Sequence, residues 1–186
     1  MMKLEEIRPL LSSELTTKPN HDGTKLASVL VVIYGDEPKV IMTKKSEILK
    51  IHAGEISFPG GKWDKNDEDL LTTALRETKE EIDLEIKPEQ IIGQLKPVRT
   101  LNSGFTITPF VAVIDNLSNL TNNFEVESIL HIPLVLFLKT LEDDPDPNHH
   151  SIQEMYIFKF DDHVVWGASA RILKQIVDIF KKNNLI

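Results

Sequence analysis

The sequence predicts an α/β (α+β) fold, a sandwich of strands and helices in one domain that spans residues 1–186. The segment 26–35 is apolar and rich in β-branched residues, as a buried strand would be. The segment 67–83 repeats apolar residues at helical spacing, and a second helical pattern runs from about residue 168 to residue 181. Because strands are expected both before and after the helix at 67–83, helices and strands alternate along the chain, which favours a layered arrangement.

Local patterns place the remaining elements. An amphipathic helix is expected at residues 2–14, inside an N-terminal extension of residues 1–25 whose role stays open. A Gly-Asp-Glu-Pro turn joins the strand 26–35 to the segment 39–45, which predicts an antiparallel hairpin. The other expected strands are 56–58, 90–96, 105–114 and 155–160. The segments with no single regular pattern are a long ordered loop at 46–66 around the short strand, a helix or strand at 135–141, and an exposed loop at 143–148.

Composition excludes several classes of function. The chain of 186 residues has no cysteine, which rules out disulfides, thiolate metal sites and a cysteine nucleophile. Its 29 acidic side chains against 21 basic ones give a formal net charge of −8, which disfavours binding to nucleic acid or to a membrane surface. An anionic substrate would need a local basic pocket or a divalent cation. The acidic N-terminus and the absence of a long apolar run predict a cytoplasmic protein without a signal peptide or a membrane span.

Three glutamates on the helix expected at 67–83 form the clearest candidate site. Glu77, Glu80 and Glu81 stand at positions i, i+3 and i+4, so their carboxylates are expected to converge on one face. One interpretation is a solvated charged face. The other is a metal site, because Mg²⁺ or Mn²⁺ prefers oxygen ligands and would remove the repulsion among the three carboxylates.

The surroundings of the acids favour the metal site. Gly60 and Gly61 lie a short loop before the helix, where a bare backbone could bring the Gly60 carbonyl to the same metal. Arg76 lies beside the acids and four residues before Glu80, so its guanidinium can hold a carboxylate in place. The sequence therefore predicts a divalent-cation site made of glutamates and one backbone carbonyl.

The segment GGKWDKNDEDLLTTALRETKEEIDL at residues 60–84 resembles the Nudix box. Arg76 and the three glutamates fall in register with the Arg-Glu and Glu-Glu pairs of that pattern. The resemblance implies a Nudix-type α/β/α sandwich with a mixed, mainly antiparallel sheet. It also implies that a loop–helix–loop holds catalytic divalent cations, and that the chain hydrolyses a diphosphate linkage in a nucleotide derivative.

The segment departs from the box at three places. The acid that partners Arg76 is either Glu68, after a six-residue spacer from the second glycine, or Asp67, after the five residues that the box uses. Thr78 replaces an aliphatic residue. Asp83 stands where the box has a glycine that ends the helix in a left-handed conformation. Since aspartate tolerates a positive φ better than most residues, we expect the metal site to survive this change.

The segment IMTKKSEILKIHAGEISFPGG at residues 41–61 resembles the signature upstream of the box in the coenzyme A diphosphatase branch of this family. Lys45 and Lys50 replace its two arginines, which keeps the charge but loses the planar guanidinium fork. The segments 122–134 and 163–177 resemble later parts of the same branch. The resemblance implies cleavage of coenzyme A, or one of its derivatives, to 4′-phosphopantetheine and adenosine 3′,5′-bisphosphate.

These patterns assign roles to individual residues. The residues expected to contact the substrate are Lys44, Lys45, Lys50, Gly61 and Lys62. His52 adds a further polar group to the same loop. Among the catalytic residues, Arg76 orients the acids, Glu77 is the first candidate for the proton acceptor, and Glu125 is the second. Glu127 is the rival of Glu125 for that role.

Two other functions stay open. A Nudix hydrolase could act instead on ADP-ribose, a dinucleotide or a nucleoside triphosphate. A catalytically silent nucleotide-binding module would share the fold, although such modules usually lose the box acids and this chain keeps all three. In each case the expected partner is a small nucleotide, not a nucleic acid or a membrane. The apolar strands also allow a homodimer.

Overall fold

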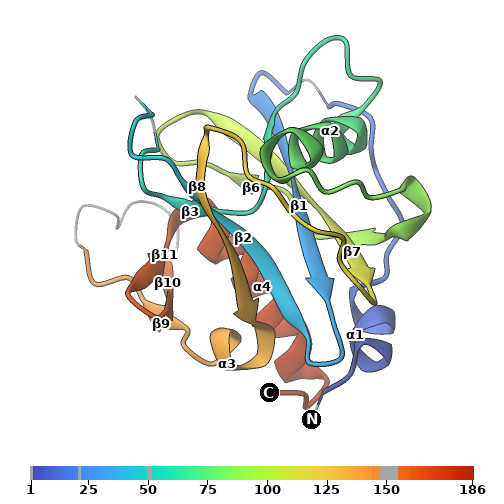
Figure 1. The fold of residues 1–186 in the computed structure, drawn as a ribbon, viewed down its shortest axis with the longest axis vertical. Coiled ribbons are helices and arrows are strands. Elements are labelled where there is room, and N and C mark those ends of the chain that lie inside the picture. The colour runs from blue at the N-terminus through green and yellow to red at the C-terminus, as the bar shows by residue number, and fades with distance from the viewer. Residues whose placement is uncertain (1, 21, 50–51, 147–154) are drawn as a thin grey trace.

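A mixed sheet of eight strands forms the centre of the structure, a computed structural model that describes residues 2–20, 22–49, 52–146 and 155–186 (Figure 1). The strands are β1 (Lys25–Tyr34), β2 (Lys39–Lys45), β3 (Ile56–Ser57), β4 (Gly60–Lys62), β5 (Ile91–Gln94), β6 (Val98–Arg99), β7 (Phe105–Ile114) and β8 (Val126–Pro133). The order along the sheet is β3-β2-β1-β7-β5, with β4 paired to β1, β6 to β7 and β8 to β2.

The longest pairing in the sheet is the parallel one between β1 and β7. It runs in register from Lys25 opposite Phe105 to Tyr34 opposite Ile114. The other pairings in the described part of the sheet are antiparallel, including the expected hairpin of β1 and β2. This confirms the prediction of a mixed, mainly antiparallel sheet.

A smaller sheet and the helices complete the fold. The smaller sheet contains β9 (Glu142–Asp143), β10 (Tyr156–Phe160) and β11 (His163–Val165). The helices are α1 (Leu4–Leu11), α2 (Leu70–Ile82), α3 (Leu134–Leu138) and α4 (Gly167–Lys182), with a 3₁₀ turn at Pro88–Gln90. In the described segments, no helix combines the length and the apolar character that crossing a bilayer would require.

Two hydrophobic cores lie on opposite faces of the large sheet, because successive side chains of a strand point to opposite sides. On β1, Val31 and Ile33 join the core that is covered by α1, α3 and α4. Leu30 and Val32 join the second core, which is covered by α2. The sheet is therefore the middle layer of an α/β/α sandwich, with α2 and α4 on opposite faces (Figure 1). This confirms the predicted fold class.

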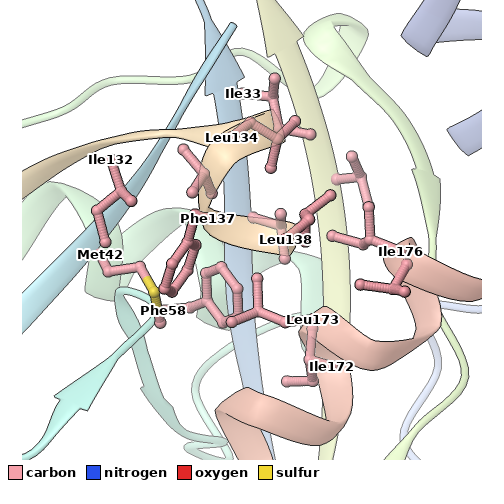
Figure 2. Close-up of a cluster of buried hydrophobic side chains, with 14 of the residues drawn as sticks. Ile33, Met42, Phe58, Ile132, Leu134, Phe137, Leu138, Ile172, Leu173 and Ile176 are labelled. Carbon is pink, nitrogen blue, oxygen red and sulfur yellow. The ribbon is translucent and has the colours of Figure 1, made fainter. Parts of the chain in front are cut away.

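The larger core is closed by side chains from distant parts of the chain. Figure 2 shows residues of β2, α3 and α4 meeting there, among them Met42, Phe137 and Leu173. All three are at most 2% exposed. Burying a side chain of this size contributes roughly 2–3 kcal/mol relative to leaving it in water, so this core supports the sheet on the side away from α2.

Several predicted boundaries are wrong. The helix predicted at 67–83 begins at Leu70, because the Asp69 side chain accepts a hydrogen bond from the Thr72 amide and caps it there. The predicted loop 46–66 contains a second strand, β4, which pairs with β1. Residues 135–141 contribute mainly to the short helix α3.

The prediction of an exposed loop at 143–148 is wrong at its start. Asp143 belongs to β9 and pairs with Tyr156 of β10. Asp144 is 3% exposed, since its amide donates to the Met155 carbonyl and draws the chain onto β10. Residues 147 and 148 lie outside the described residues.

Two buried threonines of α2 allow a matched test of packing. Thr78 is fully buried, and within the described segments its hydroxyl has no hydrogen-bond partner. We expect Thr78→Val to raise the free energy of unfolding by about 1 kcal/mol, because an unsatisfied buried hydroxyl is destabilising. Thr73 is equally buried but donates to Asp67 at 2.8 Å. Thr73→Val should therefore lower the free energy of unfolding by roughly 2 kcal/mol. Urea denaturation of both variants checks this, and equal effects of one sign would contradict it.

Candidate active site

Helix α2, which carries the three glutamates, ends in the way that the departure at Asp83 predicts. Asp83 is the C-cap of α2 and has φ of 54° and ψ of 32°, the left-handed conformation that glycine usually supplies. Its amide donates to the Lys79 carbonyl at 2.9 Å. Aspartate thus takes the place of the glycine of the box without changing the end of the helix.

Arg76 holds together the acidic side chains around it. Its Nε and Nη2 donate to the two carboxylate oxygens of Asp67, each at 2.9 Å. Its Nη1 donates to Glu77 at 3.0 Å and to Glu80 at 3.2 Å. Of the two acids that the sequence offers as partner, Asp67 makes the paired contact, and this confirms that alternative over Glu68. The Arg76 guanidinium lowers the pKa of Asp67 to about 2, so this carboxylate is charged at neutral pH.

Glu81 is the most buried acid of the site. It is 2% exposed, and one carboxylate oxygen accepts a hydrogen bond from the ammonium group of Lys45. The other oxygen, Oε2, has no partner among the described residues. Burial raises the pKa of Glu81, and the nearby charges of Glu77 and Glu125 raise it further, while Lys45 acts in the opposite direction. A buried carboxylate with one oxygen unsatisfied is a group that a cation would stabilise.

Glu77 lies directly against the backbone of β4. A Cβ added to Gly61 would lie 2.4 Å from the carboxyl carbon of Glu77, so only glycine permits this approach. Burial raises the pKa of Glu77, whereas its hydrogen bond from Arg76 lowers it. The carboxylate is therefore partly desolvated and lies at the edge of the sheet.

The carbonyl of Gly60, the predicted backbone ligand, is not used in the pairing of β4 with β1. Its φ is 151°, and an added Cβ would lie 2.3 Å from the Ser28 carbonyl oxygen. Gly60 is paired with Val29. The hydrogen bonds between the two strands are made by other pairs, since the Leu30 amide donates to the Pro59 carbonyl and the Trp63 amide donates to the Leu26 carbonyl. Because backbone groups alternate in direction along an antiparallel ladder, the Gly60 carbonyl points away from β1.

The three box glutamates do not form a ready-made metal site. In the segments that the structure describes, no three acidic or histidine side chains lie close enough to hold a metal ion together. Glu77 and Glu80 converge on Nη1 of Arg76, whereas Glu81 contacts Lys45, so the prediction that all three carboxylates converge is wrong for Glu81. The chemistry of the donors nevertheless fits a hard divalent cation, since they offer carboxylates, a backbone carbonyl and the unsatisfied Oε2 of Glu81. When bound, such a cation supplies Lewis-acid polarisation of phosphate oxygens and lowers the pKa of bound water.

The two acids before β8 and at its start differ in what they contact. Glu125 belongs to a loop that contacts the end of α2, because the Asn123 amide donates to the Glu81 carbonyl and the Asn123 side chain accepts from the Glu125 amide, each at 2.9 Å. The charge of Glu125 also raises the pKa of Glu81. Its carbonyl accepts a hydrogen bond from the Ser46 amide at 2.8 Å, so the loops after β2 and before β8 are joined. Glu127 instead forms an ion pair with Lys44 at 2.8 Å. Of the two, Glu125 is the acid whose loop is hydrogen-bonded to the end of α2.

The structure brings some of the predicted substrate residues to the acids and not others. Lys45 and Gly61 contact Glu81 and Glu77, as described above. Lys62 is not brought there, because it follows Gly61 on a strand and so points to the opposite face. Its ammonium group lies 5.7 Å from the centre of the Phe105 ring.

Two further loop residues were predicted near the substrate, His52 and Lys50. His52 lies 2.8 Å from Glu55, and Lys50 lies outside the described residues. The contact that sequence reasoning missed is the pairing of Lys45 with Glu81. The available signal was the opposite charge of the two segments, one with lysines around Lys45 and one with glutamates around Glu81. Whether the two segments lie close together depends on the fold.

Comparison with known proteins agrees with this geometry. A family model described as the NUDIX domain matches residues 24–176. The chain belongs to the Nudix family. It is a Nudix hydrolase, an enzyme that acts on pyrophosphate bonds, and its substrates are nucleotide derivatives. Nudix hydrolases generally use divalent metals, which agrees with the donor set on α2.

Two bacterial relatives are similar over most of their length. The chain is 32% identical over 159 residues to "Uncharacterized Nudix hydrolase NudL" of Photorhabdus laumondii, covering 83% of this chain and 84% of the relative. It is 33% identical over 157 residues to the protein of the same name from Yersinia enterocolitica, covering 81% of this chain and 78% of the relative. These similarities support the hydrolase assignment.

Solved Nudix structures share the fold at low identity. A MutT/nudix family protein from Enterococcus faecalis superposes with a TM-score of 0.59 at 16% identity, covering 91% of this chain and 64% of that chain. The NUDIX domain of Shewanella oneidensis NrtR, complexed with ADP ribose, superposes with a TM-score of 0.56 at 18% identity. That comparison covers 87% of this chain and 88% of that chain. At these identities the likeness shows the fold alone.

The glutamates of α2 lead to a first prediction for this Nudix hydrolase. Glu80→Gln and Glu81→Gln should each lower turnover at least about a hundredfold, because each removes a charged oxygen donor for the cation while changing little volume. Glu85→Gln is the matched control, since Glu85 is an exposed glutamate just beyond the helix that pairs with Lys79. Steady-state kinetics with circular dichroism to verify folding checks this. Near-normal turnover in both variants would remove these acids from the mechanism.

A second prediction concerns Arg76, whose guanidinium contacts Asp67, Glu77 and Glu80. Arg76→Ala should weaken metal affinity more than substrate affinity, because the carboxylates lose the group that fixes their positions. Metal titration and substrate KM, measured on the same preparation, separate the two effects. A change confined to substrate KM would contradict the positioning role.

Proposed function

We propose that this Nudix hydrolase cleaves the diphosphate linkage of coenzyme A, or of one of its derivatives, with water. The products are 4′-phosphopantetheine and adenosine 3′,5′-bisphosphate. The observation that supports the proposal is the resemblance of residues 41–61 to the upstream signature of the coenzyme A diphosphatase branch. This segment includes β3, the first two residues of β4 and all but the start of β2. It lies beside the catalytic helix, with Lys45 contacting Glu81 and Gly61 contacting Glu77.

The proposed division of labour follows from the contacts. Glu77, Glu80 and Glu81, with the Gly60 carbonyl, hold Mg²⁺ or Mn²⁺. Glu77 is also the first candidate to take the proton of the attacking water, since it lies beside the other two acids on α2. Glu125, which lies beside Glu81, is the alternative proton acceptor.

The basic side chains of the upstream loop are proposed to bind the anionic substrate. Lys44 contributes least, because its ammonium group lies 2.8 Å from Glu127 and 3.8 Å from Glu47. Lys45 forms an ion pair with Glu81, so its positive charge is already partly neutralised by that carboxylate. Lys50 is therefore the residue at which a contact to the 3′-phosphate of coenzyme A can be tested most directly.

Substrate identity can be tested with coenzyme A and dephospho-coenzyme A, which differ by the 3′-phosphate. We expect kcat/KM to be about 5–30-fold higher for coenzyme A, because one partly hydrated lysine–phosphate contact contributes roughly 1–2 kcal/mol. The ratio should fall in Lys50→Ala and at raised salt, which screens an exposed contact. Equal values for both substrates, unchanged by Lys50→Ala, would end the case for this contact.

A wider substrate panel distinguishes the proposal from the other two functions. The panel contains coenzyme A, ADP-ribose, a dinucleotide and a nucleoside triphosphate, each with Mg²⁺ and with Mn²⁺. The highest kcat/KM on ADP-ribose or on a dinucleotide would overturn the coenzyme A assignment while leaving the Nudix chemistry intact. Tight nucleotide binding without turnover of any compound would indicate a binding module.

A further inference from the structure

Lys45 occupies a fixed position at the end of β2. Its amide donates to the Glu55 carbonyl at 2.8 Å, and its carbonyl accepts from the Gly54 amide at 3.1 Å. Successive side chains of a strand point to opposite faces, so Lys45 lies on the same face as Ile41, which packs in the core covered by α2, and Lys44 lies on the face of Met42. The backbone therefore directs Lys45 toward the acids of α2, while Lys44 contacts Glu127.

The Lys45–Glu81 pair is buried, unlike the ion pairs on the surface of the protein. The Lys45 side chain is 14% exposed and that of Glu81 is 3% exposed. The ammonium group contacts one carboxylate oxygen, and in the described part of the chain the other has no hydrogen-bond partner. A buried carboxylate without a positive partner is strongly destabilising, so Lys45 supplies a charge that the protein needs at this point.

We propose that Lys45 is a built-in counter-ion, which takes the place of the divalent cation at Glu81 in the metal-free protein and leaves Glu81 when the cation binds. The inference rests on the proposed use of Glu81 as a metal ligand. Lys45 is thus a positioning residue that competes with the metal for one carboxylate. It raises the stability of the metal-free protein and lowers the affinity for the metal.

Electrostatics favour exchange over sharing at this carboxylate. An ammonium group and a divalent cation that touch the same carboxylate repel each other strongly, because water does not screen charges inside the protein well. Arg76 differs from Lys45 in this respect. It keeps its paired contact with Asp67 whatever happens at Glu77 and Glu80, so it need not leave. The exchange is therefore expected at Lys45 and not at Arg76.

The test compares Mn²⁺ binding by the full chain and three variants, using calorimetry or the paramagnetic resonance of free Mn²⁺. Lys45→Met removes the competing charge, and Lys45→Arg retains it. Lys39→Met is the matched control, because it changes net charge equally from a position roughly 20 Å away along the same strand. Measurements at pH 8 keep the freed carboxyl group ionised. We expect Lys45→Met to lower the Kd for Mn²⁺ about tenfold, and the other two variants to leave it within about twofold.

Thermal unfolding provides a readout that does not depend on activity. Without metal, Lys45→Met should unfold at a lower temperature than the wild-type protein, and saturating Mn²⁺ should raise its Tm by more than it raises the wild-type Tm. A purely structural role for Lys45 would lower Tm equally with and without metal.

The outcomes separate failure of the inference from failure of the metal site. If the wild-type protein binds Mn²⁺ and Lys45→Met binds it equally or more weakly, the competition is overturned while the metal site stands. If Glu81→Gln leaves Mn²⁺ affinity unchanged, Glu81 is not a ligand and both are overturned.

Discussion

Glu77, Glu80 and Glu81 lie within two turns of α2, and the repulsion among them must be balanced whether or not a cation is bound. The protein balances it with two cations of different design. Arg76, on α2 itself, donates hydrogen bonds to Asp67, Glu77 and Glu80. Lys45, at the end of β2, donates to Glu81. The local arrangement of the site follows from this balance, since each of the three glutamates contacts one of these two basic side chains.

A second constraint is the close approach of backbone to carboxylate. Gly61 leaves room for the Glu77 carboxyl group, and Gly60 adopts a φ of 151° against the Ser28 carbonyl. Both residues lie in β4, which pairs with β1, so the sheet carries the site and fixes the distance from Gly61 to α2. A mobile loop would not keep a carbonyl and a carboxylate in position with comparable precision.

The sequence predicted those parts of the fold and site that depend on local pattern. Periodicity predicts the helix that carries the acids, and turn residues predict the hairpin of β1 and β2. The requirements of helix capping predict the left-handed conformation of Asp83. Spacing narrowed the partner of Arg76 to two acids, and the start of α2 at Leu70 leaves Asp67 outside the helix, where it can fold back onto Arg76. The strand at β4, the buried Asp144 and the Lys45–Glu81 pair depend on contacts between distant segments. No local pattern contains those contacts.

The N-terminal extension, whose role the sequence leaves open, contributes to the position of the catalytic helix. The buried residues of α1 join the core on the far side of the sheet, and the segment that follows crosses to α2, where the Thr17 carbonyl accepts a hydrogen bond from the Leu70 amide at 2.9 Å. At the other end of α2, the Asn123 amide donates to the Glu81 carbonyl at 2.9 Å. Because a helix is stiff, anchoring both of its ends fixes the side chains between them. The positions of the carboxylates are therefore set from both ends of α2, by the N-terminal segment at Leu70 and by the loop before β8 at Glu81.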